Sequence, residues 1–250
     1  FCQSNGYSFT MNMNQINLEF IDKYRVWLVN ANGYEGDTAY KYFSLFGSAL
    51  KIAKGHGRMF NNPFDYEIQY PKKSDNKIVY LTGEEVQKMK YTRFKYERIK
   101  RAFLFMCYTG LRQGDCCNLT WADLPIINGD TKLNVMNQKA KTDIFFSLPN
   151  EVLKILPNRK GDSDKVFLNL RFGKVENERL RMWAIMSGIQ KHITPHTARH
   201  TFAFIMLSEN NIPLYTVSKL LGHTDSRTTQ NSYGHLSNQN LDGAMLKAFG

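Results

Sequence analysis

The sequence predicts a mainly α-helical protein with one small β-sheet, divided into two domains. Apolar residues recur three and four residues apart in most of the chain, which is the period of an α-helix. Two short apolar runs, 132–137 and 144–148, have the length of strands and flank a polar segment, as in a hairpin. The polar, basic stretch 71–77 has no periodicity and is typical of a linker. We therefore predict a helical domain at 1–73, a linker at 74–80 and a larger domain at 81–250.

Two helices and a turn account for the first domain. The first helix is expected over 14–30, where the apolar side chains form one stripe: Ile16, Leu18, Phe20, Ile21, Tyr24, Trp27 and Leu28. The second is expected to begin with Thr38 as its N-cap and to end at Gly55 and Gly57, because glycine adopts the left-handed backbone that ends helices. The segment Asn62-Pro63-Phe64-Asp65 has the composition of a turn.

The second domain is predicted to combine several helices with the hairpin. In order, we expect a helix capped by Thr82 and Glu85, a helix over 95–109 before Gly110, the hairpin with a basic tip at 138–143, a helix opened by Thr194 and Pro195, and one from Pro213 to about Gly222. The chain has no internal repeat and no low-complexity tract.

Composition and charge favour an intracellular protein that meets a polyanion. The net charge is +11; residues 1–73 hold 8 Lys and Arg against 6 Asp and Glu, which leaves 25 against 16 for the remainder. Lys and Arg bind nucleic acid by releasing the counterions condensed on its phosphates. The apolar runs are too short to cross a bilayer, and we expect a cytoplasmic protein. The spacing of Cys2, Cys107, Cys116 and Cys117 indicates reduced structural thiols, with no disulfide framework or zinc site.

Three segments of the second domain carry residues that can bind or attack a phosphate. His196 and Arg199 are three residues apart and share a helix face. Leu220-Leu-Gly-His223 ends the next helix, and Tyr233 follows ten positions later. Thr109-Gly-Leu-Arg112 ends a hydrophobic helix with an arginine after glycine. Each segment alone also fits an ordinary structural role: a polar surface stripe, a helix C-cap or a buried tyrosine.

Together and in this order, the segments closely resemble the tyrosine recombinases, or integrases. That family combines an arginine in T-G-L-R, a lysine on a β-hairpin, H-x-x-R-H, L-G-H and a tyrosine. This chain offers Arg112, Lys141, His196-Thr-Ala-Arg199-His200, His223 and Tyr233. Residues 1–73 resemble the family's helical core-binding (SAM-like) domain, including its N-P-F turn. Asp115 and the Lys-Thr hairpin resemble integrases of bacterial conjugative transposons most.

The resemblance implies a site-specific DNA recombinase of a mobile element. Tyr233 would attack phosphorus and leave a 3′-phosphotyrosyl link, which conserves the energy of the broken bond for rejoining, so that no ATP, metal or other cofactor is needed. Arg112 and Arg199 would clamp the phosphate, since the planar guanidinium matches its geometry. A hairpin lysine would protonate the departing 5′-oxygen. Lys141 matches the family's placement, and Lys139 is the alternative, because side chains alternate along a strand.

The resemblance also implies roles for the histidines and for Asp115. His196 would accept the proton of the tyrosine or hold the phosphate, and His223 would donate a hydrogen bond to the phosphate. Asp115 would orient Arg112 or a histidine as a supporting residue. His200 is a supporting residue as well, with a core or capping role as the alternative. The expected partners are duplex recombination sites, a homotetramer in the synaptic complex formed from free monomers or dimers, and accessory DNA-bending proteins.

Two departures and two rival functions accompany this hypothesis. The interval from His223 to Tyr233 is one residue longer than is usual in the family, so we expect the nucleophile's segment to bulge or pack unusually. The chain begins with Phe1, and we expect a preceding arm-type DNA-binding domain to be missing. Leu241, Met245, Leu246 and Phe249 are expected to dock the tail on a neighbouring protomer. A type IB topoisomerase would use the same chemistry as a monomer, and a non-catalytic DNA-binding protein would form no covalent adduct.

Overall fold

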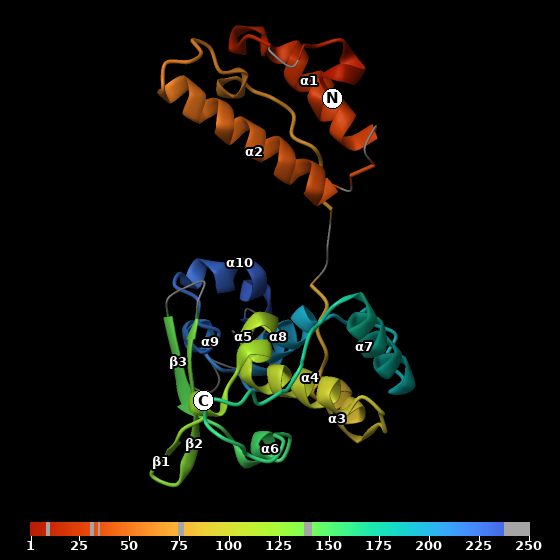
Figure 1. Cartoon of the computed structure of the whole chain (residues 1–250), viewed down its shortest axis with the longest axis vertical. Coiled ribbons are helices and arrows are strands. Elements are labelled where there is room, and N and C mark those ends of the chain that lie inside the picture. The colour runs from red at the N-terminus through yellow and green to blue at the C-terminus, as the bar shows by residue number, and fades with distance from the viewer. Residues whose placement is uncertain (9–10, 31–32, 35, 75–77, 138–141, 238–250) are drawn as a thin grey trace, which may run out of the picture. The chain divides into compact units, whose positions relative to one another are not determined.

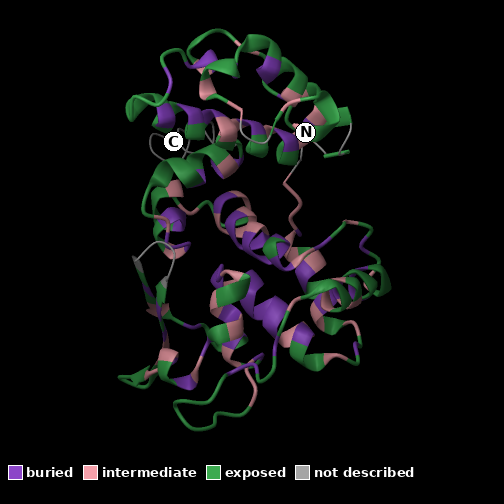
Figure 2. Cartoon of the chain, turned by 45° about the horizontal axis from the view of Figure 1, so that its top comes forward, coloured by how far each residue is buried: buried purple, intermediate pink, exposed green. Residues whose placement is uncertain are grey.

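The computed structural model describes residues 1–8, 11–30, 33–34, 36–74, 78–137 and 142–237. It divides into two compact units, 1–77 and 78–250, and each is described here by itself (Figure 1). Both units are mainly helical, and the second carries a small antiparallel sheet. Buried residues line the interior of each unit (Figure 2). Within the described residues, no helix is long and apolar enough to cross a membrane.

The first unit consists of two packed helices, α1 (Leu18–Asn30) and α2 (Gly36–Gly55), with short 3₁₀ turns. The predicted start of α1 at residue 14 is wrong, because Asn17 Oδ1 accepts the Phe20 N–H at 2.9 Å and begins the helix there. Thr38 is likewise not the N-cap of α2, since it lies inside the helix. The predicted turn is confirmed as a 3₁₀ turn over Pro63–Asp65. The core is formed by Ile16, Phe20, Ile21, Leu28, Ala39, Phe43, Leu50, Ala53 and Met59.

The helix α4 (Glu97–Thr109) lies at the centre of the second unit, and the other elements pack around it. The remaining helices are α3 (Gly83–Tyr91), α5 (Gln113–Asn118), α6 (Asn150–Leu153), α7 (Lys174–Met186), α8 (Pro195–Phe204), α9 (Leu214–Leu220) and α10 (Ser226–Ser237), with a π turn over Ile205–Glu209. The predicted capping box of α3 is confirmed, because Thr82 Oγ1 accepts the Glu85 N–H and Glu85 accepts the Thr82 N–H.

The predicted hairpin is confirmed and gains a third strand. β2 (Asp130–Asn137) pairs antiparallel with β3 (Thr142–Ser147), in a register that puts Leu133 opposite Phe146. β1 (Ile126–Ile127) pairs with the start of β2 and gives the order β1-β2-β3. The tip of the hairpin, 138–141, lies outside the described residues.

In the second unit, α8 packs closely on the C-terminal part of α4. Gly110 ends α4 with a φ of +69°, a conformation that glycine adopts without strain. A Cβ at this position would lie 2.7 Å from the Phe202 ring of α8 and 3.0 Å from Leu221. The glycine therefore serves both the backbone turn and the close approach of the two neighbouring segments.

Candidate active site

Arg199 is the buried centre of a polar cluster in the second unit. Its side chain leaves α8 and only 3% of the residue is exposed. The guanidinium donates to the carbonyl oxygens of Gly110 and Leu221, each at 2.7 Å. These carbonyls lie at the C-terminal ends of α4 and α9, where the helix dipoles are negative. The carbonyl groups at two helix ends therefore stabilise a buried cation.

His223 is held by a helix-ending turn and by hydrogen bonds on both ring nitrogens. Gly222 has a φ of +63°, and the N–H groups of Gly222 and His223 return to the carbonyls of Lys219 and Ser218, which is a Schellman motif. Nε2 lies 2.8 Å from the Arg199 guanidinium and Nδ1 lies 2.7 Å from Thr229 Oγ1. Arginine only donates, so Nε2 accepts and Nδ1 carries the proton toward Thr229. His223 is therefore neutral in this arrangement.

Tyr233 lies on α10 and contacts α8. The residue is 3% exposed, and its hydroxyl lies 2.5 Å from Nδ1 of His200. Burial raises the pKa of Tyr233 to about 12, while Arg199 acts in the opposite direction. The Tyr233 hydroxyl is therefore protonated at neutral pH.

Arg112 and Asp115 add a cation and an anion beside Arg199. Arg112 precedes α5, and Asp115 lies in its first turn. One terminal nitrogen of Arg112 and Oδ2 of Asp115 are buried without a hydrogen-bond partner. Burial raises the pKa of Asp115, against the pull of Arg112 and Arg199. Asp115 therefore acts on the arginines through its charge, and its carboxyl group also hydrogen-bonds to the backbone of Arg112.

Residues 80–240 match the phage integrase family, and residues 1–73 match the phage integrase SAM-like domain. The first match covers more than half of the chain. The chain belongs to the phage integrase family. The predicted fold class, a SAM-like helical domain followed by an integrase catalytic domain, is confirmed, and the chain is a tyrosine-type DNA recombinase, an enzyme that cleaves and rejoins DNA.

Similar proteins include recombinases and integrases of bacteria and mobile elements. The tyrosine recombinase XerC of Bacillus subtilis (strain 168) is 29% identical over 242 residues, which are 87% of this chain and 77% of that protein. The tyrosine recombinase XerD of Listeria innocua is 31% identical over 219 residues, or 80% and 72% of the two chains. A structure of the Tn1549 transposon integrase with circular intermediate DNA has a TM-score of 0.70 at 19% identity, covering 96% of this chain and 87% of the other.

Most of the predicted site residues of this integrase-family chain meet in the cluster. Arg112, Arg199, His200, His223 and Tyr233 are linked by the hydrogen bonds and electrostatic couplings above. His196 packs edge-on against His200, with ring centroids 4.4 Å apart, and makes no hydrogen bond to Tyr233 in the described contacts. Lys141, its alternative Lys139 and the tail residues beyond 237 lie outside the described residues.

Two features differ from the sequence-based expectation for the nucleophile. The expected bulge is absent, because 226–237 form one uninterrupted α-helix. Thr229, which sequence reasoning did not single out, is 0% exposed and orients His223. It lies four residues before Tyr233, so one face of α10 carries both side chains. Helical spacing from the tyrosine was thus the signal that could have identified Thr229.

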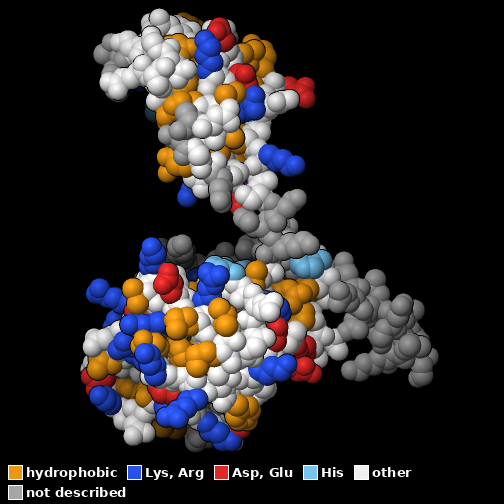
Figure 3. Space-filling view, turned by 90° about the vertical axis from the view of Figure 1, so that its right-hand side faces the viewer, with side chains coloured by type: hydrophobic (Ala, Val, Ile, Leu, Met, Phe, Trp, Pro, Cys, Tyr) orange, Lys and Arg blue, Asp and Glu red, His pale blue; other side chains and the backbone are white. Residues whose placement is uncertain are grey.

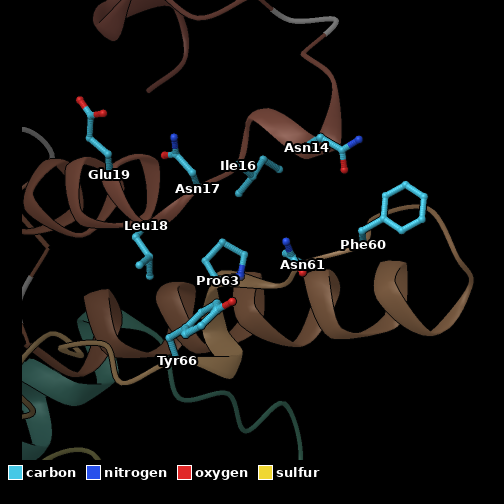
Figure 4. A pocket seen from close by; sticks show the side chains of 9 residues that line it. All are labelled: Asn14, Ile16, Asn17, Leu18, Glu19, Phe60, Asn61, Pro63 and Tyr66. Carbon is cyan, nitrogen blue, oxygen red and sulfur yellow. The ribbon is translucent and has the colours of Figure 1, made fainter.

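A hollow of about 560 Å³ in the first unit is separate from this chemistry. It opens beside the start of α1 and is lined by Asn14, Ile16, Asn17, Leu18, Glu19, Phe60, Asn61, Pro63 and Tyr66 (Figure 4). None of these residues belongs to the polar cluster of the second unit. Nor do the described residues contain a group of three or more His, Cys, Asp or Glu placed to hold a metal ion.

Neutral histidines make the stability of the protein dependent on pH. Burial, and then neighbouring cationic or histidine groups, lower the pKa values of His200 and His223 to about 4. Histidine in the unfolded chain has a pKa near 6.5. The unfolded state therefore binds more protons between these values, and stability is complete above about pH 6.5 and is lost as the pH falls toward 4. We expect the melting temperature to fall from pH 7.5 to 5, measured by scanning calorimetry.

The double variant His200→Asn, His223→Asn should show a flatter pH dependence, and the exposed-site variant His235→Asn should keep the slope of the parent. A parent melting temperature that does not change over this range would contradict the assignment of neutral histidines.

Proposed function

We propose that the chain is a site-specific recombinase of a mobile element, which cleaves and rejoins DNA through a 3′-phosphotyrosyl intermediate. The observation that carries this proposal is that Tyr233 interacts electrostatically with Arg199. The same cluster holds a nitrogen of Arg112 that is buried without a hydrogen-bond partner. A buried donor without a partner is costly, and a phosphate oxygen would satisfy it. Tyr233 is the nucleophile in this proposal, and the two arginines stabilise the negative charge on the non-bridging oxygens.

The chemistry requires three events at the scissile phosphate. The Tyr233 oxygen forms a bond to phosphorus, the bond from phosphorus to the 5′-oxygen breaks, and the 5′-oxygen receives a proton from Lys141 or, alternatively, Lys139. Nε2 of His223 accepts a hydrogen bond from Arg199, so it can donate to a phosphate oxygen only after it leaves this contact and binds a proton. The negative charge of a bound phosphate favours that exchange, because it raises the affinity of an imidazole for a proton.

Several observations support duplex DNA as the partner and a mobile element as the setting. Lys and Arg side chains are spread over the face of the second unit shown in Figure 3, in agreement with its excess of basic residues. The Tn1549 transposon integrase and a lambda integrase dimer bound to a core site have the same fold. We expect the recombinase to form a tetramer on two DNA sites, whereas a topoisomerase would relax DNA without exchanging partners.

A covalent trapping assay tests the proposed reaction. The parent chain, incubated with a nicked duplex that carries the end sequence of the element, should give a DNA-linked band on a denaturing gel. Tyr233→Phe should lose this band completely and still bind the duplex, because only the attacking oxygen is removed. Tyr215→Phe is the matched control, since Tyr215 is 65% exposed on α9, and it should retain the band. Binding without a band from the parent would instead indicate a DNA-binding module.

A further inference from the structure

His200 makes the direct contact with the hydroxyl of the proposed nucleophile. Its Nδ1 lies 2.5 Å from the Tyr233 oxygen, and the two rings meet at 65° with centroids 5.6 Å apart. His200 follows Arg199 on α8, so its position is fixed by the same buried arginine that holds the ends of α4 and α9. The contact therefore joins α8 and α10 directly.

His196 stands one step further from the nucleophile. It lies one helical turn before His200, and its ring packs edge-on against the His200 ring at 4.4 Å. His196 is exposed, whereas His200 is half-buried. The order in space is thus Tyr233, His200, His196, and His196 is left open to a phosphate while His200 is engaged with the tyrosine.

We propose that His200 is a catalytic residue that accepts the proton of Tyr233 during strand cleavage. This inference rests on the proposed function. In the step, the O–H bond of Tyr233 breaks, its oxygen forms the bond to phosphorus, and the proton moves to Nδ1 of His200. The 5′-oxygen leaves with a proton from the hairpin lysine. In rejoining, the 5′-hydroxyl attacks phosphorus and returns its proton to the hairpin lysine, the bond from phosphorus to the tyrosine oxygen breaks, and the proton on Nδ1 returns to that oxygen.

The surroundings of His200 keep it ready to accept a proton. The groups that face it are His196 and Arg199 on α8 and Tyr233 on α10. Burial and the first two groups lower its pKa to about 4, so it is neutral at pH 7. Since Tyr233 is protonated at that pH, its O–H donates and Nδ1 accepts, which puts the histidine proton on Nε2. A phosphodiester beside Arg112 and Arg199 adds a negative charge that stabilises the imidazolium.

The decisive variant is His200→Asn, and His196→Asn is compared with it by the shape of its pH profile alone. The amide of asparagine can stand near the position of Nδ1 and hydrogen-bond to the tyrosine, but it does not accept its proton. We expect His200→Asn to slow formation of the covalent adduct by about 10² to 10⁴ at pH 7, in single-turnover assays on the nicked duplex. The remaining rate should rise about tenfold per pH unit up to pH 9, because the phenolate must then form by itself, and the parent should be nearly flat over that range.

The pH profile separates proton acceptance from a purely structural role. A His200→Asn variant that keeps the parent rate, or that loses rate equally at every pH, would overturn the proposal. So would a His196→Asn variant that shows the steep profile instead. If no adduct forms with the parent itself, the proposed function fails together with this inference.

A measurement on the parent protein does not depend on whether the variants fold. Nitrogen-15 NMR of the histidines at pH 7, assigned for His200 with the full chain, should show an unprotonated Nδ1 and a protonated Nε2. The Nδ1 resonance should shift when Tyr233→Phe removes the donor. A proton on Nδ1 would mean that His200 donates to the tyrosine, and this result would overturn the proposal.

Discussion

Replacing Arg112 with glutamine should lower covalent adduct formation by about 10²- to 10³-fold and leave the folded protein as stable as the parent or more so. The loss of activity follows from removing one preorganised donor to the phosphate, which typically costs about 3 to 4 kcal/mol of transition-state stabilisation. Single-turnover cleavage of the nicked duplex measures it. Arg227→Gln is the control for the lost charge, because the Arg227 side chain is 88% exposed on the nearby α10.

The expected effect of this substitution on stability has a separate cause. One nitrogen of Arg112 is buried without a hydrogen-bond partner, so the free protein carries a desolvation cost that the phosphate would relieve. Glutamine removes the charge and lowers that cost. A clear fall in the melting temperature of Arg112→Gln would contradict this account, since it would show that the guanidinium stabilises the DNA-free fold.

The identities of the residues in the cluster could be predicted from the sequence, whereas their partners could not. Arg112, Arg199, His223 and Tyr233 occur in recognisable segments, and helix caps such as Thr82 with Glu85 have a local signature. The acceptors of Arg199 are backbone carbonyls, 89 and 22 residues away along the chain. A backbone carbonyl is present at every residue, so no side-chain pattern identifies those that receive the arginine.

The same reasoning explains the errors in the predicted elements and supporting contacts. The start of α1 depends on which asparagine accepts the Phe20 N–H, and apolar spacing alone extended the helix back to residue 14. β1 has two residues, which is too short for a periodic signal. The choice between His196 and His200 as the neighbour of Tyr233 depends on how α10 packs on α8, and both histidines lie on the same side of α8, one turn apart.

Replacing Arg199 with glutamine should remove both activity and stability, in contrast to Arg112→Gln. Two charge-assisted hydrogen bonds to the carbonyls of Gly110 and Leu221 would be lost or weakened, together with the donor to His223. Truncating a buried, hydrogen-bonded charge costs about 2 to 5 kcal/mol, much of it from the groups left unpaired. For a domain of this size, about 1 kcal/mol shifts the melting temperature by roughly 2 to 4 °C. Thermal unfolding of the full chain therefore measures the loss directly.

Arg199→Lys distinguishes the two functions of this residue. Lysine keeps a positive charge between the C-terminal ends of α4 and α9, so it should recover part of the stability that glutamine loses. It lacks the planar fork that reaches two carbonyls and a histidine at once, so adduct formation should stay at least about 10²-fold below the parent. If Arg199→Gln melts like the parent, the buried arginine does not hold the helix ends together. If Arg199→Lys cleaves like the parent, a point charge is sufficient at the phosphate, and the geometry of the guanidinium is not what the reaction requires.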